Sequence, residues 1–584
     1  MNIRSSWAKP ASALDGLGAV LLTGALLLPV GDAPWFSFWR EWAAAGAVLL
    51  IVLATIHRLR EQALPLRIDL ISLPALAVVL AAVAWAQLAF GLLAYRSDAL
   101  VPSLYLVAFA ACVSCARSLP ARDRDALADR MAAALLAAAL LSAPLAVLQW
   151  LGRATLDLGI PVHDGRPVAH MEQANLLCSL LVQGALGAWR LAERRRLPRP
   201  LACFSVAVLL SVAVLTQSRV VWLVAGLLAL IAVARSDLTQ GLRRGAGRVM
   251  LLVGMAVVAG TLLMPALDHR VGTSGLSLAD RMSGGRRPAV WVLFAQAIAR
   301  RPWAGWGALQ NGAAQYAQAL QHPSLGWYFS SAHNLALDLM LWFGVPLGLT
   351  ATVALVLAVG RRLARAPTLA ALATALAAAA LLLHAMVEFP LQYTYFLLPL
   401  ALCLGASDSA AGPGPGGRDA TGLRSLCLRL QGRFALPALA TAPALALALL
   451  AHDYIGLSDD RPVVDVDRAT RHGVLVAGPV LPQAIALDEL RAFHAFVALP
   501  LRPGLSAWDL ERARAAMLRQ PYAVSIERYA LLEGLGGHAE AAAQTIAHAC
   551  RFEPPEGCAE SQRAWVLWQQ RWPQLPPWPA TALP

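Results

Sequence analysis

Long apolar runs dominate this sequence of 584 residues. A helix needs about 20 apolar residues to cross the hydrocarbon core of a bilayer. Thirteen runs reach or approach that length, and the second and eighth are the shortest. They cover residues 13–31, 42–56, 68–94, 99–116, 131–151, 174–192, 200–217, 219–234, 249–267, 333–359, 367–386, 390–406 and 434–451. The sequence therefore predicts an all-α polytopic membrane protein with about 13 transmembrane helices.

Composition supports a membrane protein and argues against a nucleic-acid partner. Hydrophobic residues make up 58% of the chain and charged residues only 14%, whereas soluble proteins carry about 25% charged residues. The net charge of +13 comes almost entirely from arginine, because Lys9 is the only lysine. In a membrane protein such an excess marks cytoplasmic loops, so the expected partners include membrane lipids and no nucleic acid.

Arginines alternate in density from one connecting segment to the next. Seven segments, beginning with the N-terminus, carry 24 arginines and lysines, and the short loops between them carry five. The dense side is predicted to be cytoplasmic. We therefore expect a cytoplasmic N-terminus. The 151–173 loop, the 268–332 loop and the C-terminus would then lie on the outer side of the membrane, which is the periplasm for a bacterial inner membrane.

The chain changes character after the last apolar run. Residues 1–451 form the predicted transmembrane domain, and residues 452–584 form a predicted periplasmic helical domain. Within it, residues 506–519 have the pattern of an amphipathic helix that Ser506 can cap. Residues 523–550 resemble a helical hairpin interrupted by glycines at 534–537.

The eight cysteines are scattered along the chain. Cys112 and Cys115 lie inside an apolar run, where small buried side chains are the simplest interpretation. Cys550 and Cys558 lie in the predicted periplasmic tail, and they could form a disulfide in that oxidising compartment.

Polar side chains at the outer rim of membrane helices are costly to keep there, so they are functional candidates. Gln173 and Asn175 begin the sixth apolar run, where their amides could bind sugar hydroxyls or cap the helix. His170 and Glu172 precede them, together with His163 and its neighbour Asp164. Their spacing matches no compact zinc site, so no metal site is predicted.

Arginines supply the second group of candidates. Arg219 occupies a very short outer turn, where a buried guanidinium is costly unless it meets an anion. Its forked geometry suits phosphate, but it could also extend to lipid headgroups. Arg286 and Arg287, in the outer loop, could bind an anion or be ordinary loop charges.

His333 and Asn334 open the tenth apolar run on the predicted outer side. Ser330 or Ser331 is expected to cap this helix. The positive end of the helix dipole would then favour the neutral imidazole, which can accept a proton. The alternative is a rim histidine that is hydrogen-bonded to lipid or backbone.

Glu388 and Tyr393 follow the eleventh run at another outer turn. Glu388 could pair with one of the arginines or face water. Tyr393 could line the same pocket or belong to the interfacial aromatic belt. Together these side chains suit a membrane-held pyrophosphate, with arginines in place of a metal and no cofactor.

The same residues resemble the motifs of the O-antigen ligase/polymerase superfamily, and within it the bacterial protein O-oligosaccharyltransferases, or pilin glycosylation ligases. The resemblance covers roughly residues 170–405. That branch usually has proline where this chain has Ala174. The carriers are Glu172-Gln173-Ala174-Asn175, Ser218-Arg219, Arg287 with Trp291, Pro302 with Gly305 and Gly307, His333-Asn334 followed by Gly344 and Pro346, and Glu388 with Tyr393 and Tyr395.

The resemblance implies metal-independent, inverting transfer of a preassembled glycan. The donor would be an undecaprenyl-pyrophosphate-linked glycan, and the acceptor a serine or threonine of a periplasmic protein such as pilin. His333 would be the catalytic histidine, Arg219 and Arg287 would hold the pyrophosphate, and Gln173 and Tyr393 would line the site.

Three other functions share parts of this pattern. A ligase that uses lipid A core as acceptor and an O-antigen polymerase would use the same donor chemistry. A lipid-linked oligosaccharide flippase would instead have polar residues near the membrane midplane and an internal repeat. Neither of these two features is evident in the sequence.

Overall fold

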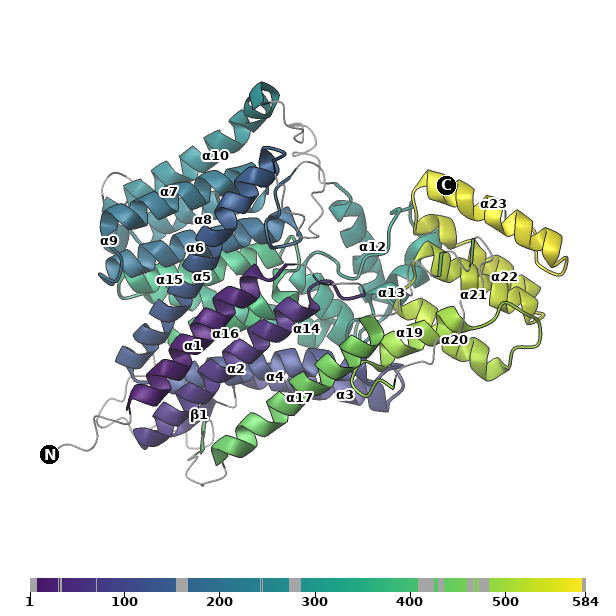
Figure 1. The fold of residues 1–584 in the computed structure, drawn as a ribbon, viewed down its shortest axis with the longest axis horizontal. Helices are drawn as coiled ribbons and strands as arrows, with labels where there is room; N and C mark the ends of the chain where they lie inside the picture. Colours follow the sequence, from purple (N-terminus) through teal and green to yellow (C-terminus); the bar gives the residue numbers. More distant parts are fainter. Residues whose placement is uncertain are drawn as a thin grey trace. The chain divides into compact units, whose positions relative to one another are not determined.

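The computed structural model describes residues 8–29, 31, 34–69, 71–153, 166–241, 243, 245–271, 285–407, 425–428, 435–458, 466–467, 470–471 and 483–579. Nearly all regular structure in these residues is helical (Figure 1). Each of the thirteen predicted apolar runs coincides with a helix. The all-α membrane class is therefore confirmed.

Six helices are long and apolar enough to cross a membrane, judged by length and composition. These are α2 (Phe38–Glu61), α4 (Ser97–Ser118), α5 (Ala121–Trp150), α10 (Gly245–Val271), α14 (Leu335–Arg365) and, within α17 (Ala435–Ser458), residues Leu439–Ser458. Six further apolar segments are shorter: residues Ala13–Leu27 within α1 (Ala8–Leu27), and the helices α3 (Leu73–Ala89), α7 (Arg199–Leu215), α8 (Val220–Ala234), α15 (Leu369–Ala385) and α16 (Thr394–Ala406). The number of thirteen spans stays a prediction.

The chain forms two compact units that alternate along the sequence. Unit 1 comprises Met1–Val78, Tyr105–Gly284 and Val353–Leu447, and unit 2 comprises Val79–Leu104, Gly285–Thr352 and Ala448–Pro584. The chain passes from one unit to the other within α3, α4, α14 and α17, and also between residues 284 and 285. The predicted domain boundary at residues 451 and 452 stays a prediction.

Unit 1 is a bundle of apolar helices. Helix α6 (Ala174–Glu193) packs on α5, α7 and α15, and α10 packs on α7 and α8 (Figure 1). Gly184 and Gly187 allow the close approach of α6 to α5, because a Cβ at Gly184 would lie 2.5 Å from the Cβ of Ala139. Small residues are the usual means of tight helix packing in membranes. Short elements complete the unit: α9 (Ser236–Thr239), η3 (Pro390–Gln392), and the antiparallel strands β1 (Leu66–Asp69) and β2 (Ser425–Leu428), paired as Leu66 with Leu428.

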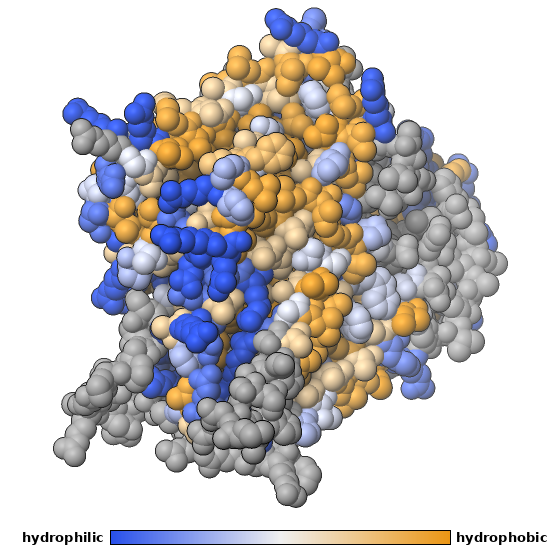
Figure 2. Space-filling model, turned by 60° about the vertical axis from the view of Figure 1, so that its left-hand side comes forward, coloured by the Kyte–Doolittle hydropathy of each residue, from blue (hydrophilic) through white to orange (hydrophobic). Residues whose placement is uncertain are grey.

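The surface of this bundle is suited to lipid. Figure 2 shows a broad apolar face with hydrophilic side chains gathered on one side of it. Large hydrophobic side chains are exposed on neighbouring helices, among them Phe204 of α7, Leu230 of α8 and Leu263 of α10. In water such a surface would be unfavourable, whereas lipid tails satisfy it.

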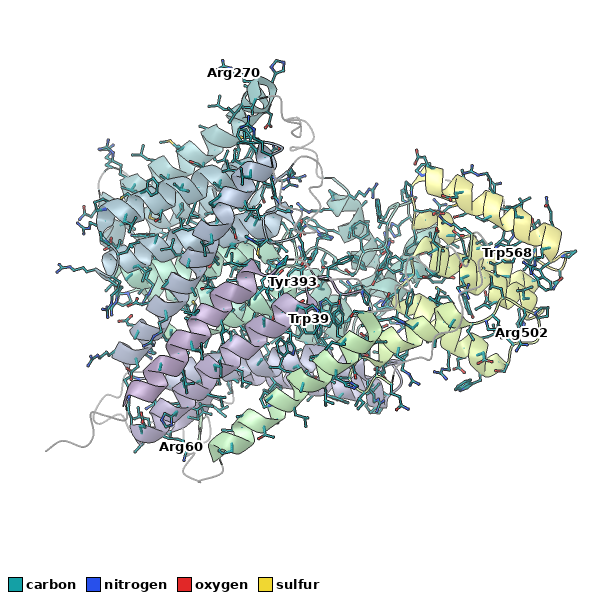
Figure 3. The ribbon with its side chains drawn as sticks, viewed as in Figure 1. Trp39, Arg60, Arg270, Tyr393, Arg502 and Trp568 are labelled. Carbon is teal, nitrogen blue, oxygen red and sulfur yellow. A yellow bond between two sulfur atoms is a disulfide. The ribbon has the colours of Figure 1, made fainter. Side chains whose placement is uncertain are left out.

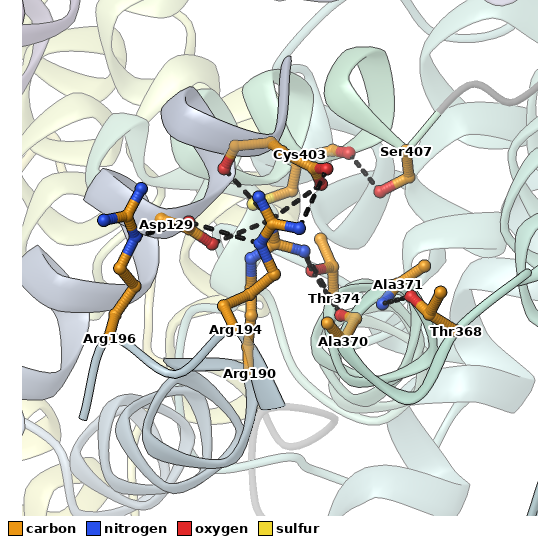
Figure 4. A network of polar contacts seen from close by, with 11 residues as sticks. Asp129, Arg190, Arg194, Arg196, Thr368, Ala370, Ala371, Thr374, Cys403 and Ser407 are labelled. Atoms are coloured by element: carbon orange, nitrogen blue, oxygen red, sulfur yellow. Dashed lines mark hydrogen bonds and ion pairs between the residues drawn. The ribbon is translucent and has the colours of Figure 1, made fainter. Parts of the chain in front are cut away.

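One end of the unit 1 bundle gathers Arg190 and two of the predicted cytoplasmic arginines, Arg194 and Arg196. Arg190 is buried and forms an ion pair with Asp129 at 2.9 Å, and it also donates to the hydroxyl of Thr374 (Figure 4). Arg194 and Arg196 approach the same aspartate. These contacts join the start of α5 and the end of α6 to α15. The membrane side that this end faces stays a prediction.

Unit 2 contains the outer loop and the C-terminal helices. The loop holds α12 (Arg287–Arg300), α13 (Asn311–Gln318) and η2 (Ala319–Gln321). Tyr316 and Tyr328 from this loop pack against the hydrophobic core of the C-terminal helices. That core includes Phe496, Ile526 and Trp565. The C-terminal elements are α19 (Asp488–Ala498), α20 (Ala507–Arg519), α21 (Ala523–Leu535), α22 (Ala539–Ile546), η5 (Ala549–Arg551) and α23 (Pro555–Arg571).

Several local predictions for the tail are confirmed. The hydroxyl of Ser506 accepts a hydrogen bond from the backbone N–H of Asp509 and caps α20. The predicted hairpin consists of α21 and α22, and Gly536 and Gly537 lie in the turn between them. Cys550 and Cys558 form a disulfide, with their Cα atoms 4.8 Å apart.

Candidate functional site

Three connections of unit 1 meet at Asn175, in the first turn of α6. Its Oδ1 accepts hydrogen bonds from Arg166 at 3.1 Å and from the Ser218 hydroxyl at 2.8 Å. Its Nδ2 donates to Glu388 at 2.9 Å. The amide therefore joins the loop before α6, the turn before α8 and the turn before α16. Residues 166, 218 and 388 are far apart in sequence, so only the fold brings them together.

Glu388 is buried, with 3% of its surface exposed. Of the two alternatives for Glu388, the one in which it faces water is therefore wrong. Asn175 bonds to Glu388 and to Arg166, so a neutral amide stands between a carboxylate and a guanidinium. Arg166 also donates from Nε to the carbonyl of Thr216 at 2.8 Å. This arrangement fixes the orientation of the Asn175 amide, because Oδ1 must accept and Nδ2 must donate.

The segment just before α6 is held by Arg40 of α2. This guanidinium is buried, pairs with Glu172 at 3.0 Å and donates to the backbone carbonyls of Leu28 and His170. Burial lowers the pKa of His170, and the charge of Arg40 lowers it further. Burial raises the pKa of Glu172, although Arg40 opposes the rise. His163 and Asp164 lie outside the described residues.

Gln173 occupies the N-cap position of α6, but its side chain makes no cap hydrogen bond. The capping role considered for this amide is therefore wrong. Gln173 is half-buried, and Glu172 before it has a φ of +59°. Such a backbone conformation is uncommon for residues that carry a side chain.

The turn between α7 and α8 is also tightly held. Gln217 has a φ of +52°, and its amide donates to Asp268 of α10 at 2.9 Å. Ser218 is buried against Asn175. Arg219 follows at the N-cap position of α8, with an exposed side chain. The expectation of a buried guanidinium is therefore wrong, because the short turn places this side chain on the surface.

Tyr393 lies at the start of α16 (Figure 3). Its ring stacks on that of Tyr395, with 5.1 Å between the centroids. Tyr395 is fully buried, and the Arg40 guanidinium lies 5.5 Å from its ring centroid. The next residue after Tyr393, Thr394, bonds to Glu41 of α2. Tyr393 is therefore fixed within the same end of unit 1 as Asn175. Sequence reasoning did not assign a role to Arg40, although it is one of only five arginines in the short predicted outer loops.

His333 lies in unit 2, in a bend just before α14. The helix begins at Leu335, and Asn334 caps it, because its Oδ1 accepts from the backbone N–H groups of Ala336 and Leu337. The expected caps, Ser330 or Ser331, and the expected place of His333 in the first helical turn are therefore wrong.

The backbone of His333 is unusual. Its φ is +51°, and its side chain is half-buried with its ring edge-on to Phe329. A residue with a side chain persists in this region only where its surroundings hold it, and such residues cluster at functional sites. The bend presents an imidazole that can exchange a proton with a bound group.

Arg286 and Arg287 begin α12 in the same unit. Arg287 is its first residue and is half-buried, whereas Arg286 is exposed. The Arg286 guanidinium lies 5.7 Å from the ring centroid of Trp327. Trp327 belongs to the same loop as His333, so Arg286 joins the start of α12 to the segment that carries the imidazole.

The segment Pro302–Gly307 packs closely against the backbone of α14 at Gly344. Gly344 interrupts α14 with a φ of +78°, and a Cβ there would lie 2.1 Å from the carbonyl oxygen of Trp303. Two backbone hydrogen bonds, from Trp306 to Leu341 and from Val345 to the carbonyl of Pro302, close the contact. Only glycine fits at position 344. The close contact with residues 302–306 holds α14, the helix that follows His333.

Carboxylates, histidines and cysteines of the described segments form no group of three or more that could hold a metal ion. Unit 2 offers the imidazole of His333 and the guanidinium groups of Arg286 and Arg287, and unit 1 offers the fixed amide of Asn175 and the guanidinium group of Arg219. Such groups can bind an anionic leaving group and activate a hydroxyl.

Comparisons with known proteins agree with this chemistry. Residues 204–352 match the family described as "O-Antigen ligase", and residues 371–556 match "Virulence factor membrane-bound polymerase, C-terminal". The chain is 30% identical over 399 residues to a "General O-oligosaccharyltransferase" of Acinetobacter baylyi, covering 67% of this chain and 68% of the relative. It is 27% identical over 248 residues to the "ComP-specific O-oligosaccharyltransferase" of the same organism, covering 42% and 44%. The chain therefore belongs to the O-oligosaccharyltransferases of the O-antigen ligase superfamily, and it is a membrane glycosyltransferase.

Proposed function

We propose that this enzyme transfers a preassembled glycan from undecaprenyl pyrophosphate to a serine or threonine hydroxyl of a periplasmic protein such as pilin. Both relatives are O-oligosaccharyltransferases, and one of them is named as specific for ComP, which supports a protein acceptor. The arginine asymmetry of the loops supports an inner-membrane protein with a cytoplasmic N-terminus. In that orientation the C-terminus and the residues of the active site face the periplasm.

The observation that carries the proposal is the bend that holds His333 at a φ of +51°. In the proposed reaction, the acceptor oxygen forms a bond to the anomeric carbon, and the bond from that carbon to the phosphate oxygen breaks. The hydroxyl proton passes to the imidazole, and undecaprenyl pyrophosphate leaves with the bonding electron pair. A single displacement of this kind inverts the anomeric centre. A positioned base contributes about 10²–10⁴-fold to such a step.

Charge neutralisation of the leaving pyrophosphate is assigned to Arg219 and Arg287. Arg219 is exposed at the start of α8, where the helix N-terminus also favours an anion. The proposed mechanism is independent of metal because these guanidinium groups take the part of a cation. Arg286 adds positive charge close to Trp327.

The remaining candidates are assigned to binding and support. Gln173 and Tyr393 are half-buried and are proposed to line the glycan site. Asn175 and Glu388 hold this end of unit 1 through their hydrogen bond. Asn334 caps α14 directly after the catalytic histidine.

A second candidate follows from the two family descriptions, which name a ligase and a polymerase. A lipid A core acceptor, or a growing lipid-linked glycan, would need the same donor chemistry. The transporter alternative is not retained, because both curated relatives are transferases.

One experiment separates these acceptors. The purified enzyme in lipid is incubated with undecaprenyl-pyrophosphate-linked glycan and, in separate reactions, with a pilin, with lipid A core or with no added acceptor. We expect glycosylated pilin alone, and the same rate with a chelator present. Glycosylated lipid A core, longer lipid-linked chains or loss of activity with the chelator would each contradict the corresponding part of the proposal.

A further inference from the structure

A buried carboxylate lies directly beneath the bend that carries His333. Asp338 is in the first turn of α14 and is 1% exposed. Its Oδ1 accepts from the backbone N–H of Ala332 at 2.8 Å and from Nδ2 of Asn311 at 2.9 Å. Its Oδ2 accepts from the hydroxyl of Ser331 at 2.6 Å. All of these residues belong to unit 2.

The partners of Asp338 are themselves fixed. Nε1 of Trp342 donates to Oδ1 of Asn311 at 2.6 Å, so the amide of Asn311 must present its N–H groups to the carboxylate. The hydroxyl oxygen of Ser331 also accepts from the backbone N–H of His333 at 3.0 Å. Asp338 therefore contacts the two residues before His333, and through Ser331 it reaches the backbone of His333 itself.

This arrangement accounts for the backbone of the histidine. A left-handed conformation of a residue with a side chain persists only where several contacts determine it. Asp338 provides those contacts from a rigid helix, and Asn311 ties it to α13. The carboxylate lies inside the predicted rim of the membrane, where an acidic side chain is costly without a purpose.

We propose that Asp338 is a positioning residue that holds the Ser331–His333 bend and thereby aims the imidazole. This proposal rests on the proposed function of His333 as the proton acceptor. Asp338 acts through hydrogen bonds to the bend, and the negative charge of the carboxylate is secondary.

The test compares three variants in the purified enzyme. Asp338→Ala removes every bond to the bend, and we expect kcat to fall about 100-fold while KM for the lipid-linked donor changes less than threefold. Asp338→Asn keeps an acceptor for Ala332 and Asn311, and its N–H group can donate to the Ser331 oxygen. We therefore expect Asp338→Asn to restore kcat to within tenfold of the wild type.

Two further measurements separate positioning from general stability. Asp453 is a matched control, because it is a buried aspartate of the same unit that accepts from the backbone N–H groups of residues 485–487. We expect Asp453→Ala to lower thermal stability with an unchanged kcat. Hydrogen–deuterium exchange should become faster in the 329–335 peptide of Asp338→Ala and stay unchanged there in Asp453→Ala.

Three results would overturn the proposal. The first is an Asp338→Ala enzyme with the kcat of the wild type. The second is an equal loss in Asp338→Ala and Asp338→Asn, because charge rather than hydrogen bonding would then dominate. The third applies if Asp338→Ala does not fold. Ser331→Ala then removes the hydroxyl that links Asp338 to the backbone of His333 and leaves the other bonds of Asp338 in place, and an unchanged kcat in Ser331→Ala would overturn the proposal. Failure of the proposed function is seen separately, as full activity of His333→Ala.

Discussion

Removal of the Asn175 side chain should lower the rate of glycan transfer strongly, although the side chain is only half-buried. Asn175→Ala breaks three hydrogen bonds, to Arg166, Ser218 and Glu388. Bonds with a charged partner contribute about 1.5–3 kcal/mol each, and neutral ones about 0.5–1.5 kcal/mol. Water can form part of the lost hydrogen bonds, so we expect the net loss of interaction free energy to be about 3 kcal/mol. If the transition state of glycan transfer needs the three segments in their native positions, this loss raises its free energy by the same amount. The rate of transfer is then about 150-fold lower.

Asn175→Asp tests the direction of the bonds. It keeps the volume and an acceptor for Arg166, but it places a second carboxylate oxygen against Glu388, where Nδ2 lies at 2.9 Å in the wild type. Two carboxylates at this distance repel each other. We therefore expect Asn175→Asp to be at least as impaired as Asn175→Ala, although it is the closer replacement in shape.

The assay is glycan transfer to pilin at saturating donor, normalised to the amount of folded enzyme. Gln183→Ala is a matched control on the same helix, because Gln183 lies at the middle of α6 and its amide donates to the carbonyl of Ala377. We expect that control to keep its rate within threefold of the wild type. Our reasoning is refuted if Asn175→Ala is as active as Gln183→Ala.

Three further outcomes are expected. Replacing Cys550 and Cys558 by serine opens a disulfide loop with a sequence separation of 8. It should lower stability by about 2–3 kcal/mol, seen as a lower Tm, and an unchanged Tm would contradict this. Burial, and then the nearby carboxylate of Asp98, raises the pKa of Glu489 to about 7. Folding therefore takes up a proton, and the stability from this group is lost as the pH rises from about 4.5 to 7. Glu489→Gln should reduce the fall in Tm between pH 5 and pH 8, and an equal fall would disprove it. Arg219→Ala should slow transfer about 100-fold, with only partial recovery in Arg219→Lys because lysine lacks the forked geometry; wild-type rates in both variants would exclude this role.

Local signals in the sequence predicted much of the fold. Apolar runs mark the helices because lipid requires each backbone group to be satisfied within its own segment. Ser506 and the glycines at 534–537 mark helix ends through their own backbone chemistry, and Cys550 and Cys558 are close enough in sequence to pair.

The site required contacts that no local pattern encodes. The Asn175 bridge depends on side chains about 200 residues apart. At the start of α14, Ser330, Ser331 and Asn334 all have capping side chains, and the choice of Asn334 follows from where the helix packs. The sequence analysis assigned no role to Asp338. A signal was present, because Asp338 is the sixth residue of the apolar run 333–359, and a carboxylate inside such a run needs partners.

The role of His333 is the central claim, and single-turnover transfer by the purified His333→Ala enzyme tests it most directly. His548→Ala is the matched control, because His548 is also half-buried in unit 2 and stacks on Tyr316. We predict that His333→Ala is folded and binds donor, with transfer slower by about 10²–10⁴-fold, while His548→Ala keeps the wild-type rate. A His333→Ala enzyme within threefold of the wild type would contradict the account.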